Sequence, residues 1–165
     1  MSENWTFAAI AAPYGRAMIK GKITNMKLVV SDLERSLDFY KSVFGLEVGA
    51  RLDFTGPDVT EVMLDGPDGT RILVLLHSDL MPAPKPIPGY APLVVQVDDI
   101  ATAKSGIEKA GYEVAVGPLE FGPVGIVMVA DPDGYLIEIV AGDPNAVQGP
   151  PAGTKIPHPI PQIHG

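Results

Sequence analysis

The stretch Met26-Lys-Leu-Val-Val-Ser-Asp-Leu33 decides the fold, because a second stretch, Leu93-Val-Val-Gln-Val-Asp-Asp-Ile100, repeats its pattern. Each stretch is an apolar strand that runs into an aspartate, Asp32 or Asp99, followed by apolar residues at helical spacing. Aspartate is a favoured N-cap, because its side chain accepts a hydrogen bond from the first turn of a helix. The sequence therefore predicts the same strand–helix unit twice, and such a repeat defines the architecture of the chain.

The rest of each unit repeats in the same order. Both predicted helices stop at a glycine, Gly45 or Gly111, which is the usual residue just after a helix C-terminus. Both units close with a Pro-Asp-Gly turn, at Gly66–Gly69 and Asp131–Gly134, before a last apolar strand. We expect an α+β fold of two βαβββ modules that form a curved eight-stranded mixed sheet around a cavity, with the helices outside.

Five segments follow from this repeat. The first module is predicted at 23–78 and the second at 90–141. A proline-rich linker, 79–89, separates them, an N-terminal extension, 1–22, precedes them, and a proline-rich tail, 142–165, follows. Because proline fixes φ and lacks an amide donor, the linker and the tail are predicted to be neither helix nor inner strand.

Composition limits the partners and the chemistry. The 165-residue chain has a formal net charge of −8, and such an acidic surface repels phosphate backbones and anionic lipids. We therefore expect no nucleic-acid and no membrane partner. The chain has no cysteine, which excludes disulfides and thiolate chemistry. The apolar patch Phe7–Ala12 is too short for a signal peptide or a membrane span, so a cytoplasmic location is predicted.

Two motifs carry a resemblance to a known family. The segment from Met26 to Tyr40, followed by Val43-Phe-Gly-Leu46, resembles the opening module of the vicinal oxygen chelate superfamily, which includes glyoxalases, bleomycin-resistance proteins and ring-cleaving dioxygenases. The segment Asp131-Pro-Asp-Gly-Tyr-Leu-Ile-Glu-Ile139 resembles its closing strand. The resemblance implies the two-module fold, a small-molecule ligand in an apolar cavity, and a homodimer. It does not specify a reaction, because this fold hosts many.

In metal-dependent members of that family, the first and last strands of each module supply the metal ligands. On the first strands the corresponding positions here are Asn25 and Pro92. On the last strands they are Leu73, or Val74 if the register slips by one residue, and Glu138. A divalent ion generally needs three or four His, Asp or Glu ligands, and only Glu138 qualifies. We therefore expect no metal and no other cofactor.

Side chains alternate along a strand, so the cavity face can be counted from Glu138 and Leu73. Five polar residues predicted on this face are candidates for substrate binding: Asn25, Lys27, Arg71, His77 and Gln96. Glu138 is the candidate catalytic residue, as a general base in an apolar strand. The alternative is that Glu138 is only paired with Lys27 or Arg71, because an unpaired carboxylate is costly there.

Several candidate residues have a second interpretation. Arg71 and Lys27 become surface charges if the register is wrong by one residue, and His77 at its strand end could be a solvated loop residue. Phe39 and Tyr40 in the first helix are predicted to pack in the core rather than in a site.

Three functions are compatible with these residues. The first is a metal-independent lyase or isomerase, in which Glu138 moves a proton next to a carbonyl and Arg71 or Lys27 stabilises the oxyanion. The second is a ligand-sequestering protein similar to the bleomycin-resistance members. The third is a divergent metal enzyme that uses Glu138 with the tail histidines, His158 and His164. The retained glutamate favours the first and the missing ligands favour the second, so the sequence leaves open whether the protein is an enzyme.

Overall fold

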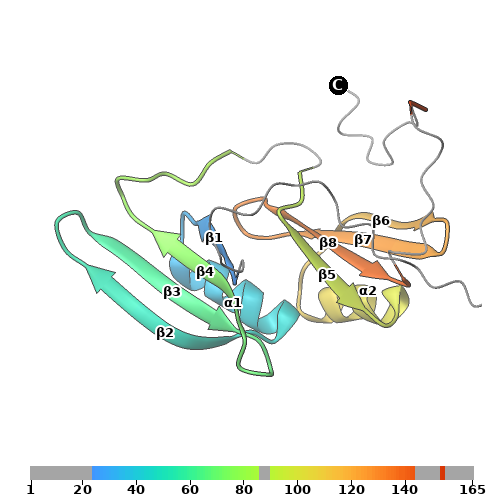
Figure 1. The fold of residues 1–165 in the computed structure, drawn as a ribbon, viewed down its shortest axis with the longest axis horizontal. Helices are drawn as coiled ribbons and strands as arrows, with labels where there is room; N and C mark the ends of the chain where they lie inside the picture. Colours follow the sequence, from blue (N-terminus) through green and yellow to red (C-terminus); the bar gives the residue numbers. More distant parts are fainter. Residues whose placement is uncertain (1–23, 86–89, 144–152, 155–165) are drawn as a thin grey trace, which may run out of the picture.

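The computed structural model describes residues 24–85, 90–143 and 153–154 (Figure 1). The elements follow the predicted order of two βαβββ modules. They are β1 (Met26–Val29), α1 (Leu33–Phe44), β2 (Glu47–Phe54), β3 (Val59–Asp65), β4 (Arg71–His77), β5 (Leu93–Val97), α2 (Ile100–Lys109), β6 (Val114–Phe121), β7 (Val124–Ala130) and β8 (Leu136–Ala141).

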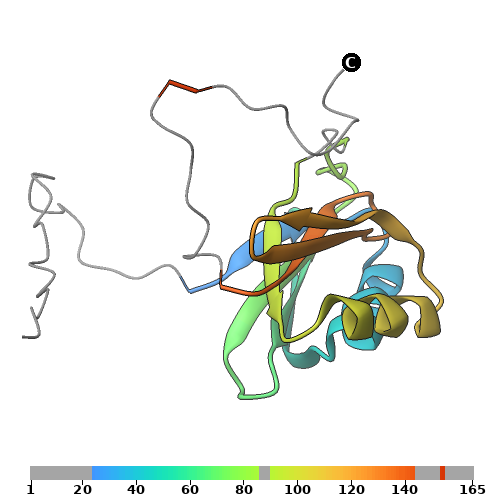
Figure 2. The same cartoon turned by 90° about the vertical axis from the view of Figure 1, so that its right-hand side faces the viewer.

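The eight strands form two four-stranded sheets, ordered β1-β4-β3-β2 and β5-β8-β7-β6. In each sheet the first strand pairs in parallel with the last, and the other pairs are antiparallel. The α+β class with two βαβββ modules is thus confirmed, although hydrogen bonds join the strands as two sheets of four and not as one sheet of eight. Figure 2 shows α1 and α2 next to each other on one side of the sheets. We call the opposite side of each sheet its open face.

The helix ends confirm the predicted caps. Asp32 accepts a 3.0 Å hydrogen bond from the Arg35 amide, and Asp99 accepts one of 2.7 Å from the Thr102 amide. The contacts with Thr102 hold the pKa of Asp99 below its ordinary value. After α1 the chain turns at Gly45, whose φ of 65° is the left-handed conformation that glycine adopts without strain.

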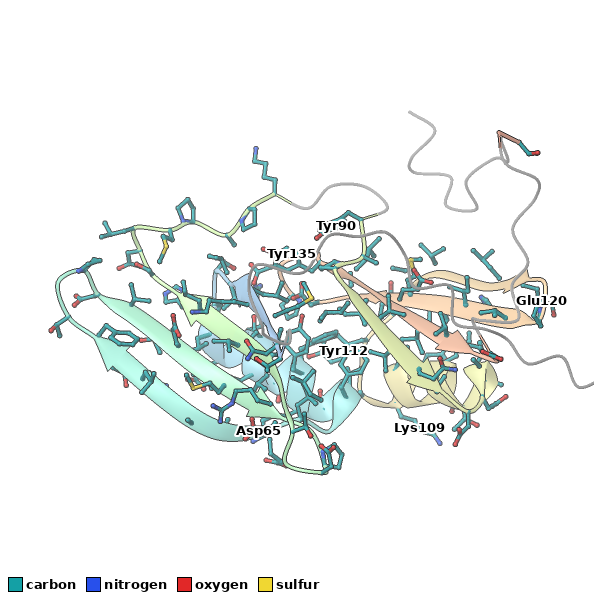
Figure 3. All side chains as sticks on the ribbon, viewed as in Figure 1. Asp65, Tyr90, Lys109, Tyr112, Glu120 and Tyr135 are labelled. Carbon is teal, nitrogen blue, oxygen red and sulfur yellow. The ribbon has the colours of Figure 1, made fainter. Side chains whose placement is uncertain are left out.

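One hydrophobic core serves both modules. The helix-side residues of β4 and β8 and the two aromatic residues of α1 are at most 2% exposed: Leu73, Leu75, Ile137, Ile139, Phe39 and Tyr40. The ring of Phe39 meets that of Tyr112 edge to face with 4.8 Å between centroids. Figure 3 shows Tyr112 between the two halves of the molecule. The prediction that Phe39 and Tyr40 pack in the core is confirmed.

The second module docks on the first through its Pro-Asp-Gly turn. The buried Asp131 accepts a 2.9 Å hydrogen bond from the Tyr40 hydroxyl of α1. Asp133 accepts the Ser31 amide at 3.1 and 3.2 Å, just before α1 begins. Burial raises the pKa of both Asp131 and Tyr40. Carboxylates of one module therefore satisfy polar groups of the other.

The turn of the first module does not dock in this way. Asp68, the counterpart of Asp133, accepts hydrogen bonds at 2.9 and 2.8 Å from the amide and hydroxyl of its own neighbour Thr70. Gly66 stands where the second module has Asp131, and it has no side chain to offer. The two modules are thus alike in topology but are joined asymmetrically.

The last strand of the first module contains a bulge that the second module lacks. In the β3–β4 ladder Leu64 pairs with Leu73 but Asp65 pairs with Arg71, which leaves Ile72 as an extra residue. The β7–β8 ladder continues without interruption. A bulge of this kind shifts by one residue which side chains face each side of the sheet.

Among the described residues, no helix has the length and apolar character needed to cross a membrane.

Candidate functional site

The open face of the second sheet carries Glu138. In the parallel ladders Glu138 pairs with Val94, whereas Val74 pairs with Lys27. Val94 and Lys27 precede the two N-cap aspartates by the same number of residues, so Val74 is the counterpart of Glu138. The assignment of this position to Leu73 is wrong. Val74, the residue expected if the register slips by one, occupies it. The physical reason is the bulge at Ile72, which a count from the turn overlooks.

Glu138 lies in apolar surroundings. Its ladder partner in β7, Met128, is 4% exposed, and its ladder partner in β5, Val94, is 63% exposed. The side chain itself is partly buried. No side chain of the described ranges forms a hydrogen bond or an ion pair with the carboxylate of Glu138. The carboxylate is therefore available to a ligand that reaches the open face.

Lys27 and Arg71 are paired elsewhere. The Lys27 ammonium lies 2.5 Å from a carboxylate oxygen of Glu61, with β4 between their strands. The Arg71 guanidinium binds Asp65 with 3.0 Å between Nε and Oδ1. Within one copy of the chain, therefore, neither Lys27 nor Arg71 neutralises Glu138. Sequence reasoning missed Glu61, although the alternation of β3 would have placed it on the same face as Lys27.

His77 is not brought together with Glu138. It follows Leu73 and Leu75 at alternate positions of β4, and these two leucines are fully buried on the helix side. Its Nδ1 lies 3.0 Å from the carbonyl oxygen of Val30. The cavity face counted from Leu73 is thus wrong for His77, again because of the bulge. Arg71 lies on the other side of the bulge from Leu73, so the alternation counted from Leu73 does not say which face of the sheet Arg71 occupies.

Asn25 and Gln96 flank the open faces. Asn25 donates a 3.0 Å hydrogen bond to the Thr24 hydroxyl. It lies two residues before Lys27 and therefore on the same face. Gln96 donates a 2.6 Å hydrogen bond to the Gly142 carbonyl. It lies two residues after Val94 in β5 and therefore on the same face. Both side chains are exposed. Asn25, Lys27, Gln96 and Glu138 therefore belong to the open faces, and their role in substrate binding stays a prediction.

The residues at the four metal-ligand positions do not fit a metal ion. Val74 and Pro92 have no side-chain donor atom, and the amide of Asn25 is a weak ligand. Within the described ranges no three His, Asp or Glu side chains are grouped so as to hold an ion. His158 and His164 lie outside the described residues. We therefore derive no step through a metal at these positions.

The hollows on the described surface include three that bear on the candidate residues. Two broad ones, of about 480 and 310 Å³, meet at His77 beside the linker, and each includes the exposed Asp79. The third, which we call the seam pocket, is a hollow of about 210 Å³ between the modules. Its lining consists of Tyr40, Phe44, Leu46, Pro67, Ile72, Leu73, Leu93, Val94, Val95 and Ile137. Of the three, it alone includes a register neighbour of Glu138, Val94.

The fold agrees with the comparisons. The family model of the Glyoxalase/Bleomycin resistance protein/Dioxygenase superfamily matches residues 22–139, and the chain belongs to this superfamily. It is 33% identical over 129 residues to the lactoylglutathione lyase of Neisseria meningitidis serogroup A, covering 72% of this chain and 89% of that protein. It is 29% identical over 127 residues to a probable lactoylglutathione lyase of Vibrio cholerae, covering 74% and 92%.

Solved structures show the same architecture. The trypanothione-dependent glyoxalase I of Leishmania major matches with a TM-score of 0.61 and 26% identity, covering 74% of this chain and 87% of that one. The fosfomycin resistance protein FosX of Listeria monocytogenes, solved with Mn(II) and sulfate, matches with a TM-score of 0.61 and 17% identity, covering 77% and 97%. The second likeness shows the fold alone.

Proposed function

We propose that the protein is a glyoxalase-like lyase that moves a proton next to a carbonyl, with Glu138 as the acid/base and without a metal at the four family positions. One observation carries the proposal. Glu138 keeps the family position on β8, lies partly buried beside Met128 and Val94, and its carboxylate has no partner among the described residues. A carboxylate so placed is free to accept a proton from a bound substrate.

The proposed step conserves atoms and electrons. Glu138 takes a proton from the carbon next to the carbonyl, and the electron pair of that C–H bond moves toward the carbonyl oxygen. The first carbon of the substrate carries a hydroxyl, whose proton passes to the former carbonyl oxygen while the same carboxyl returns its proton to the former carbonyl carbon. The first carbon thereby becomes the new carbonyl, and the substrate is rearranged without an external oxidant. Lys27 is the cation we assign to the oxyanion, because Glu61 occupies one of its N–H donors and an ammonium has three.

We further propose that a second copy of the chain completes the site. Large apolar side chains are uncovered on the sheets: Leu52 is 42% exposed, Phe54 48% and Val94 63%. Light scattering after size exclusion should give a dimer mass, and Leu52→Asp should shift it toward the monomer. A wild-type monomer at micromolar concentration contradicts this part of the proposal.

The relatives' name supplies the first reaction to test, the formation or cleavage of lactoylglutathione. Replacing Glu138 by Gln should lower kcat by about 100-fold or more, because the amide cannot take a proton. Ligand binding, measured by calorimetry, should be retained. Glu113→Gln, at an exposed position outside the site, is the matched control. A Glu138→Gln protein with wild-type turnover refutes the proposed role.

A second candidate is a ligand-sequestering protein similar to the bleomycin-resistance members. The missing metal ligands at Val74 and Pro92 favour it. The variant Glu138→Gln distinguishes the lyase from the sequestering protein. A sequestering protein has no turnover, so the substitution would change only its affinity for the ligand. The third candidate, a metal held by Glu138 with His158 and His164, is tested by metal analysis of the purified protein. The cytoplasmic location stays a prediction.

A further inference from the structure

Lys27 lies between two of the four positions at which metal-dependent members of the superfamily hold their ion. Asn25 lies two residues earlier on the same face, and Val74 is the ladder partner of Lys27 in β4. Neighbouring strands lie about 4.8 Å apart, and residues two apart on one strand lie roughly 6.6 Å apart. A cation held at these two positions would therefore lie next to the side chain of Lys27.

The side chain of Lys27 crosses the neighbouring strand. Its ammonium nitrogen lies 2.5 Å from Oε1 of Glu61 in β3. Lys27 is in register with Val74 and Glu61 with Leu76, so the two side chains meet over β4. Val74 and Leu76 belong to the open face, yet they are only 4% and 8% exposed. The ammonium therefore lies over the strand that supplies a ligand in metal-dependent members and has Val74 at that position here.

Glu61 is the more enclosed partner of this ion pair. Its side chain is 17% exposed, whereas that of Lys27 is 46% exposed. A carboxylate in such a position loses part of its hydration, and a cation beside it compensates the loss. Within the described ranges the ammonium has no other partner, so two of its three N–H donors stay available to a ligand. The pair thus presents a held positive group on the open face of the first sheet.

The second module has no such pair. The counterpart of Lys27 is Val94, as the parallel ladders show. The counterpart of Glu61 is Ile126, which holds the same place in its own ladder. The second sheet carries the lone carboxylate of Glu138 instead. The repeated topology therefore does not require an ion pair here, and the pair belongs to the sequence of the first sheet alone.

We infer that the ammonium of Lys27, held by Glu61, takes the place of the divalent cation that metal-dependent members of the superfamily bind. The family positions lack ligands at Val74 and Pro92, and a positive group already lies beside two of the four. A fixed positive charge repels a second cation and stabilises negative charge on a ligand oxygen. Together with the function proposed above, on which this last step rests, Glu61 is a positioning residue that directs Lys27 to the oxyanion.

Metal binding tests the inference without an assay of activity. The host is the variant Asn25→His/Val74→Glu, which restores two ligand side chains next to Lys27. Adding Lys27→Met should tighten Ni(II) binding, measured by calorimetry, at least tenfold, because the repelling charge is removed. Adding Lys104→Met, which breaks the ion pair with Glu108 on α2, should leave the affinity unchanged. Equal affinities with and without Lys27, or no binding by either protein, overturns the inference.

A second measurement keeps Val74 in place, so it does not depend on the fold accepting a glutamate there. Lys27→Met leaves the carboxylate of Glu61 without its cation, so the paramagnetic ion Mn(II) should broaden the methyl signals of Val74 and Leu76. The same concentration of Mn(II) should not broaden them in wild type or in Lys27→Met/Glu61→Gln. Equal broadening in wild type and in Lys27→Met contradicts the inference.

The positioning role of Glu61 is tested by a double-mutant cycle. Glu61→Gln should lower kcat about tenfold with KM unchanged, and Lys27→Met should lower kcat at least as much. In the Lys27→Met protein, Glu61→Gln should have no further effect, because Glu61 acts through Lys27. A merely structural role would change KM and stability as well. Losses that add in the double variant refute the positioning role.

The held cation and the proposed function can fail separately. The Ni(II) and Mn(II) measurements do not involve proton transfer by Glu138. The expected Ni(II) result together with a fully active Glu138→Gln protein supports the held cation and refutes the lyase mechanism. An inactive Glu138→Gln protein together with equal Ni(II) affinities, with and without Lys27, does the reverse.

Discussion

The hydroxyl of Tyr40 in one module lies 2.9 Å from the carboxylate of Asp131 in the other, and both side chains are buried. Asp131 also accepts the amides of Asp133 and Tyr135 at 3.0 and 2.8 Å. One carboxylate thus shapes its own turn and ties that turn to α1. Because the ring of Tyr40 also lines the seam pocket, this contact sets the position of one pocket wall.

Removing the Tyr40 hydroxyl should destabilise the fold. Tyr40→Phe leaves the buried Asp131 with one donor fewer, and a lost partner of a buried charged acceptor costs about 1–3 kcal/mol. Urea unfolding of the two proteins should show this decrease in the free energy of unfolding. Tyr112→Phe is the matched control, since Tyr112 packs against Phe39 through its ring and should change stability by less than about 0.5 kcal/mol. Equal effects of the two variants would contradict the role of the hydrogen bond.

The buried Asp131 should make stability depend on pH. Burial, the largest cause, raises its folded-state pKa above the ordinary value of about 3.9. A raised pKa means that the native state binds the proton more tightly, so this contribution is full below about pH 3.9 and is lost as the pH rises through the folded-state pKa. The stability advantage of wild type over Asp131→Asn should therefore shrink as the pH rises through the raised folded-state pKa of Asp131, measured by urea unfolding.

Asp99 provides a control of opposite sign. Its hydrogen bonds with Thr102 lower its pKa, so its contribution is present above about pH 3.9 and is lost as the pH falls through the folded-state value. The advantage of wild type over Asp99→Asn should grow as the pH rises through this range. If both aspartates show the same trend, the environment assigned to Asp131 is wrong.

Two glycines should respond oppositely to alanine. Gly142 has a φ of 99°, and a Cβ there would lie 2.4 Å from the carbonyl oxygen of Pro123. Gly142→Ala should cost about 1–3 kcal/mol through backbone strain, with the clash adding to it. Gly106 lies within α2 and a Cβ there meets nothing within 4 Å. Gly106→Ala should stabilise the protein by about 0.5–1 kcal/mol. Thermal unfolding of both variants checks the pair of signs.

Chelation should leave the lyase activity unchanged. Val74 and Pro92 provide no donor atom at two of the four family positions, and a site of useful affinity generally needs three or four ligands. Dialysis against EDTA, followed by metal analysis and assay, should change turnover by less than about twofold by this reasoning. Activity that disappears with EDTA and returns with one particular divalent ion would show that ligands from elsewhere complete the site.

The repeat makes most of the fold predictable. Asp32 and Asp99 cap the helices as expected, and the Pro-Asp-Gly turns precede the last strands. These signals are local, because a cap or a tight turn depends on only a few neighbouring residues. The role of Asp131 as a link between modules is not predictable in the same way, since it depends on Tyr40, which is distant in sequence.

The candidate site is predicted less completely, and for a definite reason. Periodicity places side chains on a face only while the ladder is regular, and the extra residue at Ile72 breaks it. Alternation counted from Leu73 consequently assigns His77 to the face of Glu138. The pairing of Lys27 with Glu61 also requires the order of strands in the sheet, which lets residues of β1 and β3 meet across β4.

The extra residue at Ile72 does not prevent the two halves from being recombined. A chimera that replaces β4 and its preceding turn with the β8 hairpin, matched residue for residue from the proline, inherits a strand without the insertion. Ile137 of the graft then lies opposite Leu64, where Leu73 lies in the native sheet, because Leu64 and Val129 hold the same place before their turns. Deletion of Ile72 alone should likewise leave Leu73 opposite Leu64 and remove only the bulge, so the insertion is local to the start of one strand.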